Sequence, residues 1–257
     1  MFKALNVSKS GLKAFQRKMD IVSNNISNVQ TTGYKKAEVK FEDLVYDSLD
    51  DNGTPFSENI SEDGILSGVG VKTKNMDRDY TQGILEKSYK GSHLAIKGEG
   101  FFGVTEKNSG KILLTRDGSF SVNTEGNLVD TNGNLVYVEN QREKLNDNIK
   151  IKENGEIYSL VDGEKELVGE IPLFKVTDSD SLINENGNYF SVNDFSINES
   201  KITNNKSAIK QGYLEKSNVD IAKEMTDMLI TQRAYQINTR SIRSADEMWN
   251  MINNIKR

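Results

Sequence analysis

Residues 4–29, ALNVSKSGLKAFQRKMDIVSNNISNV, carry two interleaved rows of apolar side chains that recur every seven residues. Together they form an a/d seam, broken only at Ser8, which is typical of a helix that packs against another helix. The stretch predicts a helix about 40 Å long that stops near Gly33. The members of this seam are Leu5, Leu12, Phe15, Met19, Val22, Ile26 and Val29.

A second apolar stripe lies at the other end of the chain, in residues 217–257, which contain neither proline nor glycine. Ser217 or Asn218 is expected to cap this helix, with Asp220 in its first turn. A lone apolar stripe in water is costly, so each stripe needs a partner: first the other stripe, then copies of the same chain. The members of the second stripe are Ile221, Met225, Met228, Leu229, Tyr235, Ile242, Trp249 and Ile252.

Between the two predicted helices, turn signals recur every eight to twelve residues and separate short apolar runs. Asp117-Gly118 and Asn132-Gly133 are pairs typical of hairpin turns, so this region is predicted to be all-β. The repeated GNLV at 126–129 and 133–136 is interpreted as two neighbouring strand starts. The acidic stretch 47–64, DSLDDNGTPFSENISEDG, reads as a loop or an extended arm.

The predicted fold class is therefore α+β. The N- and C-terminal helices are expected to pair as a coiled-coil-like stalk, with an all-β domain between them in sequence. The predicted domains are a terminal helical core of residues 1–33 with 214–257, an extended arm or linker region at 34–88, and a β-rich domain at 89–213.

Composition excludes several classes of function. The chain has 257 residues, a net charge of −5, no cysteine and a single histidine, His93. No nucleic-acid partner is expected, because no basic excess is present, and thiolate or multi-histidine metal sites are excluded. No run approaches the length of a membrane span. Lys3, Lys9 and Lys13 interrupt the N-terminus, so no cleaved signal peptide is expected.

One motif raises the possibility of a nucleotide cofactor. Gly98, Gly100 and Gly103 form a literal G-x-G-x-x-G after a predicted strand. The dinucleotide fingerprint also needs a helix after the glycines, and here another strand is predicted instead. The glycines are better explained by a bend or bulge in a β-domain. His93 has no catalytic partners at a recognisable spacing, so no catalytic residue, cofactor or metal is expected.

Polar side chains accompany both stripes. Asn24, Asn25 and Asn28 lie at the end of the first helix, and Gln232 and Asn238 lie in or beside the second stripe. Buried amides in a helical seam fix its register, whereas exposed amides merely form a solvated edge. The sequence leaves these two readings open.

Three blocks resemble the family of flagellar rod, hook and hook-associated proteins. The first is NNISNVQTTGYKK at 24–36, the second is LAIKGEGFF at 94–102 followed by TRDGSFSVNTEGNLVDTNG, and the third runs from Gln211 to Trp249. They occur in the family's order and together extend over nearly the whole chain. The positions that carry the terminal resemblance are Asn24, Asn25, Asn28, Thr31, Gly33, Tyr34, Lys35, Ser217, Asn218, Gln232, Arg233 and Asn238.

Within the family, the chain length and FEDLVYDSL at 41–49 are most similar to the distal-rod branch. The alternatives are a hook or proximal-rod subunit of the same family, or a non-flagellar coiled-coil adaptor.

The resemblance implies a structural subunit of the bacterial flagellar basal-body rod, not an enzyme, that polymerises into the drive shaft for motility. It implies export from the cytoplasm through the flagellar type III export apparatus without a cleaved signal peptide. The implied partners are copies of the chain in a helical polymer and other rod and hook subunits. The terminal helices would form an inner tube and the β-domain an outer wall, with no insertion into a membrane. The residues of the two stripes would then form the assembly interface.

Overall fold

The computed structural model describes residues 2–44, 47–48, 66–107, 109–140, 144–145, 149–161, 164–176, 182–185, 187–192 and 207–255. Most of the predicted acidic arm, residues 49–64, lies outside them. The chain forms two compact units. The first comprises Met1–Ser27, Ala37–Asp79 and Asp220–Arg257, and the second comprises Asn28–Lys36 and Tyr80–Val219. The order helix, strands, helix confirms the predicted α+β class.

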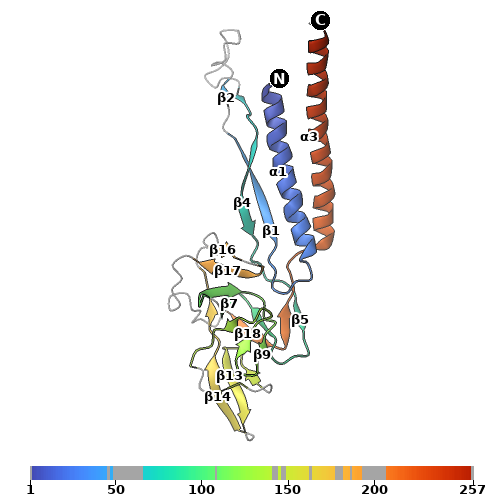
Figure 1. Cartoon of the computed structure of the whole chain (residues 1–257). Helices are drawn as coiled ribbons and strands as arrows, with labels where there is room; N and C mark the ends of the chain where they lie inside the picture. Colours follow the sequence, from blue (N-terminus) through green and yellow to red (C-terminus); the bar gives the residue numbers. More distant parts are fainter. Residues whose placement is uncertain are drawn as a thin grey trace. The chain divides into compact units, whose positions relative to one another are not determined.

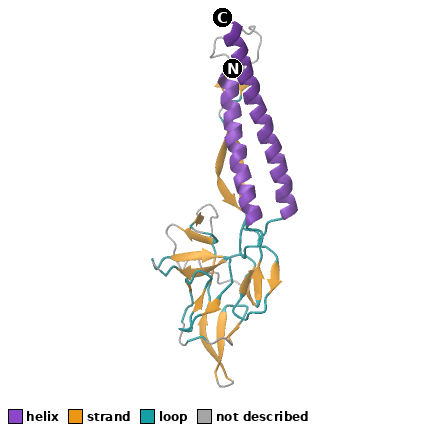
Figure 2. Cartoon of the chain, turned by 45° about the vertical axis from the view of Figure 1, so that its right-hand side comes forward, coloured by secondary structure: helices purple, strands orange, loops and turns teal. Residues whose placement is uncertain are grey.

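The first unit contains two long helices, α1 (Phe2–Ser27) and α3 (Ile221–Ile255). They lie side by side, and the two chain ends lie at the same end of the pair, so the helices are antiparallel (Figures 1 and 2). Neither helix combines the length and the apolarity that a membrane span requires, within the part of the chain that the structure describes.

A two-stranded antiparallel ribbon packs on α1 in the same unit. It consists of β1 (Ala37–Asp43) and β4 (Val71–Arg78), with a bulge between Val39 and Phe41. A short pair, β2 (Asp47–Ser48) and β3 (Leu66–Ser67), continues it. Ser10 Oγ of α1 accepts a hydrogen bond from Val71 N at 3.2 Å, and the Phe15 and Phe41 rings lie 5.9 Å apart. These contacts fix the ribbon to the helix.

The second unit is built from short antiparallel strands. Its main sheet has the order β16-β17-β8-β7-β11-β10-β9, with β15 also paired to β7. A three-stranded sheet has the order β12-β13-β14, and two further pairs are β18-β6 and β19-β5. The strands are β5 (Leu85–Lys87), β6 (Leu94–Lys97), β7 (Phe101–Thr105), β8 (Ile112–Thr115), β9 (Ser121–Val122), β10 (Leu128–Val129), β11 (Leu135–Val136), β12 (Ile149–Ile151), β13 (Glu156–Val161), β14 (Glu164–Glu170), β15 (Leu173–Phe174), β16 (Leu182–Asn184), β17 (Tyr189–Val192), β18 (Ala208–Gln211) and β19 (Tyr213–Glu215).

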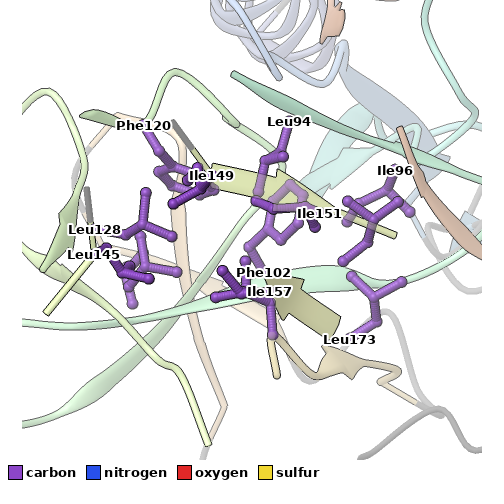
Figure 3. Close-up of a cluster of buried hydrophobic side chains, with 14 of the residues drawn as sticks. Leu94, Ile96, Phe102, Phe120, Leu128, Leu145, Ile149, Ile151, Ile157 and Leu173 are labelled. Atoms are coloured by element: carbon purple, nitrogen blue, oxygen red, sulfur yellow. The ribbon is translucent and has the colours of Figure 1, made fainter. Parts of the chain in front are cut away.

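Strand β7 supplies side chains to both hydrophobic clusters of this unit, because neighbouring residues of a strand point to opposite faces. Phe102 belongs to the larger cluster, where it meets Phe120 edge to face at 5.2 Å (Figure 3). Phe101 belongs to a smaller aromatic cluster with Phe174 and Phe190. The two clusters hold the sheets of the unit together.

The repeated GNLV segments form neighbouring antiparallel strands, β10 and β11, as predicted. The turn before each strand is built in the same way. Asn123 Oδ1 accepts the backbone N–H groups of residues 125 and 127 at 3.0 and 2.8 Å, and Asp130 Oδ1 accepts those of residues 132 and 134 at 2.8 and 2.9 Å. A short polar side chain that bonds its own following backbone stabilises such a turn.

The two units divide the predicted linker region. Ala37–Asp79 belongs with the helices, whereas the residues from Tyr80 belong with the β strands. Residues 28–33 and 214–219, which were expected in the terminal helical core, lie in the second unit, and so do residues 34–36 of the predicted linker region.

Candidate assembly interface

The buried side of α1 consists mainly of small and polar residues: Gly11, Ala14, Val22 and Asn25. A Cβ at Gly11 would lie only 3.3 Å from Asn238 Nδ2 of α3. The glycine therefore allows the two helices to approach closely.

On α3, four small or polar residues recur every seven residues and form the row that meets α1, here called the inner row: Glu224, Thr231, Asn238 and Ala245. Glu224, Thr231 and Ala245 are buried, and Asn238 is half-buried. This row, rather than the large apolar stripe alone, meets α1. Small residues at a helix contact favour close packing, but they bury little apolar area.

The large residues predicted for the interface on α1 are mostly half-buried. Val22 is the fully buried member, and Val29 follows the end of α1 and belongs to the second unit. The half-buried members on α1 are Leu5, Leu12, Phe15, Met19 and Ile26. These side chains keep apolar surface that the single chain does not cover.

The predicted residues of α3 fall into two groups. Met228, Tyr235, Ile242 and Trp249 are half-buried, whereas Ile221, Met225, Leu229 and Ile252 are exposed. Four further large residues that were not predicted are exposed too: Ile230, Ile237, Met248 and Met251. We call these eight exposed residues the α3 apolar face. At about 100° per residue, most of them lie 100° or more around the helix from the nearest member of the inner row, whereas Ile252 continues that row seven residues after Ala245.

A buried amide and a buried carboxylate join the two helices and the ribbon. Asn25 Nδ2 donates to Glu224 Oε2 at 3.0 Å and to Ala37 O at 2.9 Å, while Asn25 Oδ1 accepts from Ala37 N at 3.0 Å. Asn25 and Glu224 are each 1% exposed. Asn25 is therefore a buried amide of the helix pair, whereas Asn24 and Gln232 are exposed.

The start of α3 differs from the expectation. Asp220, not Ser217 or Asn218, caps the helix: its Oδ1 accepts the N–H groups of Ala222 and Lys223 at 2.9 and 3.3 Å. Any of the three side chains suits a cap, so sequence preference alone did not distinguish them.

Ser217 and Asn218 instead order the connection within the second unit. Ser217 Oγ accepts from Val219 N at 3.2 Å, and Asn218 Oδ1 accepts from Lys36 N at 2.8 Å.

Most of the remaining motif residues gather in the second unit. Thr31 Oγ1 donates to Asn28 Oδ1 at 3.2 Å, and Tyr34 is buried. Gly33 has a φ of +67°, and a Cβ there would lie 2.5 Å from Asp117 N. Glycine is therefore required at this position for both its conformation and its lack of a side chain. Arg233, on α3 in the first unit, is exposed.

Glu215 is the centre of a buried ionic cluster in the second unit. Lys35 Nζ lies 2.6 Å from Glu215 Oε1, and Arg116 Nη1 lies 3.1 Å from Oε2. Gly83 N donates to Oε1 at 2.9 Å, and Gly33 N donates to the Glu215 carbonyl at 2.8 Å. One carboxylate thus ties the segment after α1 to strand β19 and to the segment after β8.

Burial lowers the pKa of the Arg116 guanidinium from its ordinary value, and the Glu215 carboxylate opposes that lowering. Arg116 Nη2 also donates to Gly98 O at 2.9 Å, and the guanidinium lies over the Phe101 ring at 5.4 Å. These contacts compensate for removing the charge from water.

The glycine motif joins two strands. Gly98 and Gly100 have φ values of +108° and +122° and connect β6 to β7, and Gly103 lies within β7. A strand follows the motif, so the helix N-terminus that a dinucleotide site uses does not follow here. Among the described residues, no group of three or more histidine or acidic side chains is placed to hold a metal.

The sequence interpretation gave no structural role to Arg116, Glu215, Glu224 or Thr231. Their partners lie far away along the chain: Arg116 and Glu215 are 99 residues apart, and Asn25 and Glu224 are 199 apart. The seven-residue spacing of Glu224, Thr231, Asn238 and Ala245 was a visible signal. It was overlooked because the residues are not large and apolar.

Comparison with protein families gives three matches in chain order. Residues 5–35 match the family described as "Flagella basal body rod protein". Residues 95–159 match "Flagellar hook protein FlgE/F/G D1 domain", and residues 210–255 match "Flagellar basal body rod FlgEFG protein C-terminal".

Individual proteins match over almost their full length. A "Flagellar basal-body rod protein FlgG" of Buchnera aphidicola subsp. Acyrthosiphon pisum (strain APS) is 37% identical over 96% of this chain and 97% of that protein. A protein of the same name from Borreliella burgdorferi is 34% identical over 100% of both chains. The "Flagellar hook-basal body complex protein FlhP" of Bacillus subtilis is 29% identical over 100% of both.

Proposed function

The chain belongs to the flagellar basal-body rod protein family, and from this premise we propose that it is the distal rod subunit. It is a structural subunit of the rod in the flagellar basal body, and its family is not one of enzymes. Its partners are copies of itself and other rod and hook subunits. The full-length similarity to rod proteins named FlgG supports the distal position.

The α3 apolar face carries the proposal for how the rod is held together. Its eight large apolar side chains are exposed in the single chain, and Ile237, for example, is 63% exposed. Covering one such side chain contributes about 1.5–3 kcal/mol before entropy costs. Neighbouring copies that cover this face and the half-buried stripe residues would favour the polymer. The assembly interface therefore comprises the predicted stripe residues together with Ile230, Ile237, Met248 and Met251.

The route to the basal body is part of the proposal. The chain leaves the cytoplasm through the flagellar type III export apparatus, without a cleaved signal peptide, and its terminal helices join the inner tube of a helical polymer. The absence of cysteine supports this route, since no disulfide has to form or break during passage.

A pair of α3 variants tests the interface. In cells whose own copy is deleted in frame, Ile237→Asp is expected to give truncated, hookless rods and loss of swimming, because it places a charge on the α3 apolar face. Gln236→Asp is the matched control: it adds the same charge at an exposed polar position about 100° around the helix from Ile237. Swimming and electron microscopy of isolated basal bodies are the measurements.

Complete rods with Ile237→Asp would refute the interface, and motile cells after deletion alone would refute the rod function. Circular dichroism of purified Ile237→Asp should show unchanged β structure, because Ile237 lies outside the second unit.

A further inference from the structure

A polar pocket lies in the second unit, at three hairpin connections of the main sheet, whose strands β7, β16 and β17 are labelled in Figure 1. Its lining residues come from the segment 106–113 that leads from β7 into β8, from the turn 132–134 between β10 and β11, and from the segment 185–189 that leads from β16 into β17. The volume is about 370 Å³, within the range of about 300–1,000 Å³ that ligand pockets occupy. Most such pockets are apolar, whereas this lining is polar except for Leu113 and the ring of Tyr189.

The repeated turns before β10 and β11 show which contacts exceed what a turn requires. In each turn one side-chain oxygen, of Asn123 or of Asp130, accepts two backbone N–H groups. Asp130 has a second carboxylate oxygen where Asn123 has an amide nitrogen. This Oδ2 accepts from the Tyr189 hydroxyl at 2.6 Å and from Asn134 Nδ2 at 3.1 Å. The turn itself needs the first oxygen alone, so the second oxygen serves to order the pocket.

Tyr189 is held in a fixed position at the pocket. Its hydroxyl donates to Asp130 and accepts from Asn132 Nδ2 at 2.8 Å. Burial raises the pKa of this hydroxyl above its ordinary value, and the Asp130 carboxylate adds to the rise. The hydroxyl therefore stays protonated at neutral pH. A ring that is fixed before a ligand arrives loses little freedom on binding, so it suits stacking.

Two carboxylates lie on the opposite part of the lining. Glu185 Oε1 accepts from Lys111 Nζ at 2.7 Å and from Ser191 Oγ at 2.8 Å. Glu106 Oε2 accepts from Ser109 Oγ. Among the described residues, these bonds use one oxygen of each carboxylate, and the other oxygen remains as an acceptor for a ligand.

The two amides of the pocket add further acceptors. Asn132 and Asn134 bond through their amide nitrogens, to Tyr189 and Asp130 respectively, so their oxygens remain for a ligand. The Lys111 ammonium is a donor. A ligand that fills the pocket must therefore carry several donors and at least one acceptor, because polar groups that lose water need partners.

We propose that this pocket binds an uncharged carbohydrate of one or two rings. Sugar hydroxyls both donate and accept, so they match the oxygens and the ammonium together. The C–H face of a sugar ring matches the Tyr189 ring. The two carboxylates disfavour an anion, and the Lys111 ammonium beside Glu185 disfavours a second cation. The inference goes beyond the proposed function, since the pocket lies in the second unit and the α3 apolar face in the first.

Saturation-transfer NMR of the purified full-length chain tests the site. The uncharged probes are N,N′-diacetylchitobiose and cellobiose, and spermidine is the cationic probe. Saturation is expected to pass from the protein to at least one of the two sugars, whose titration then gives a Kd. Ser109→Trp, at an exposed position of the lining, is expected to abolish the transfer by filling the pocket.

The repeated turns supply a matched pair of variants. Asn132→Ala removes one amide from the pocket and should raise the Kd about five- to tenfold, the effect of losing about one hydrogen bond. Glu125→Ala, at the corresponding position of the first turn, should leave the Kd unchanged. Both positions are exposed, so both variants should keep the circular dichroism spectrum of the unaltered chain.

Four results would overturn the inference. They are the absence of transfer to both sugars at millimolar concentration, transfer that survives Ser109→Trp, equal changes in Kd from Asn132→Ala and Glu125→Ala, and tighter binding of spermidine than of either sugar.

Discussion

Glu215 shows how one side chain can decide the stability of the β-rich unit. Its carboxylate lies between Lys35 and Arg116, and all three side chains are at most 3% exposed. A buried charge cluster of this kind is sensitive to the loss of one member, because the remaining charges stay in a medium that solvates them poorly.

We expect Glu215→Ala to lower the free energy of unfolding of the β-rich unit by about 3–5 kcal/mol, because it leaves two buried cations without their carboxylate. Urea unfolding followed by circular dichroism measures the loss. Glu86→Ala is the control, since the Glu86–Lys216 pair is largely exposed and its removal should cost at most about 1 kcal/mol. Equal losses for the two variants would contradict the role of burial.

His93 is expected to make the stability of the same unit depend on pH. Desolvation by burial lowers its pKa below the ordinary 6.5, Lys90 adds to the lowering, and Asp117 opposes it. The unfolded chain therefore takes up the proton first. The contribution to stability is fully present above pH 6.5 and is lost as the pH falls towards the folded pKa.

An NMR titration of the imidazole in the folded chain should give a midpoint below 6.5. His93→Gln should flatten the dependence of stability on pH in that range. A midpoint above 6.5 would reverse the expected sign.

At the level of single residues, the sequence indicated which residues form motifs better than it indicated which residues they contact. Gly33, Tyr34 and Lys35 were identified as a motif, but the carboxylate that binds Lys35 lies 180 residues further along. Local patterns do not encode such pairings, because the approach of distant segments is set by the whole fold.

Among the elements, the two long helices were predictable because their seven-residue rows persist over many turns. The periodicity did not reveal which face meets the other helix. Large apolar residues lie on more than one side of α3, and the inner row is small and polar. A helix with apolar residues on several sides has several possible partners, and a single sequence does not rank them.

The close approach of α1 and α3 at Gly11 gives a prediction for the helix pair. Gly11→Leu should lower its thermal stability, because even a Cβ would lie 3.3 Å from Asn238 Nδ2. Asn238→Ala in the same chain should restore part of the loss by making space. Far-UV circular dichroism of the four variants of this cycle measures the coupling, and strictly additive effects would argue against direct contact.

For the whole molecule, fold class and the order of its parts followed from composition and pattern, whereas the division into compact units did not. The ribbon β1-β4 belongs with the helices although the sequence suggested a linker. Its strands are separated by the acidic stretch and pair only in three dimensions. Sequence patterns identify strands, but the partner of a strand depends on contacts that close long loops.

The pairings β19-β5 and β18-β6 join the first strands of the β-rich unit to its last. A polypeptide threaded from its N-terminus through any narrow conduit would present β5 and β6 long before their complements emerge. Completion of the unit must wait for residue 215 of 257. In a chain that is delivered N-terminus first, β5 and β6 therefore lack their partner strands for most of the passage. The β-rich unit can complete its fold only near the end of delivery, when β18 and β19 have emerged.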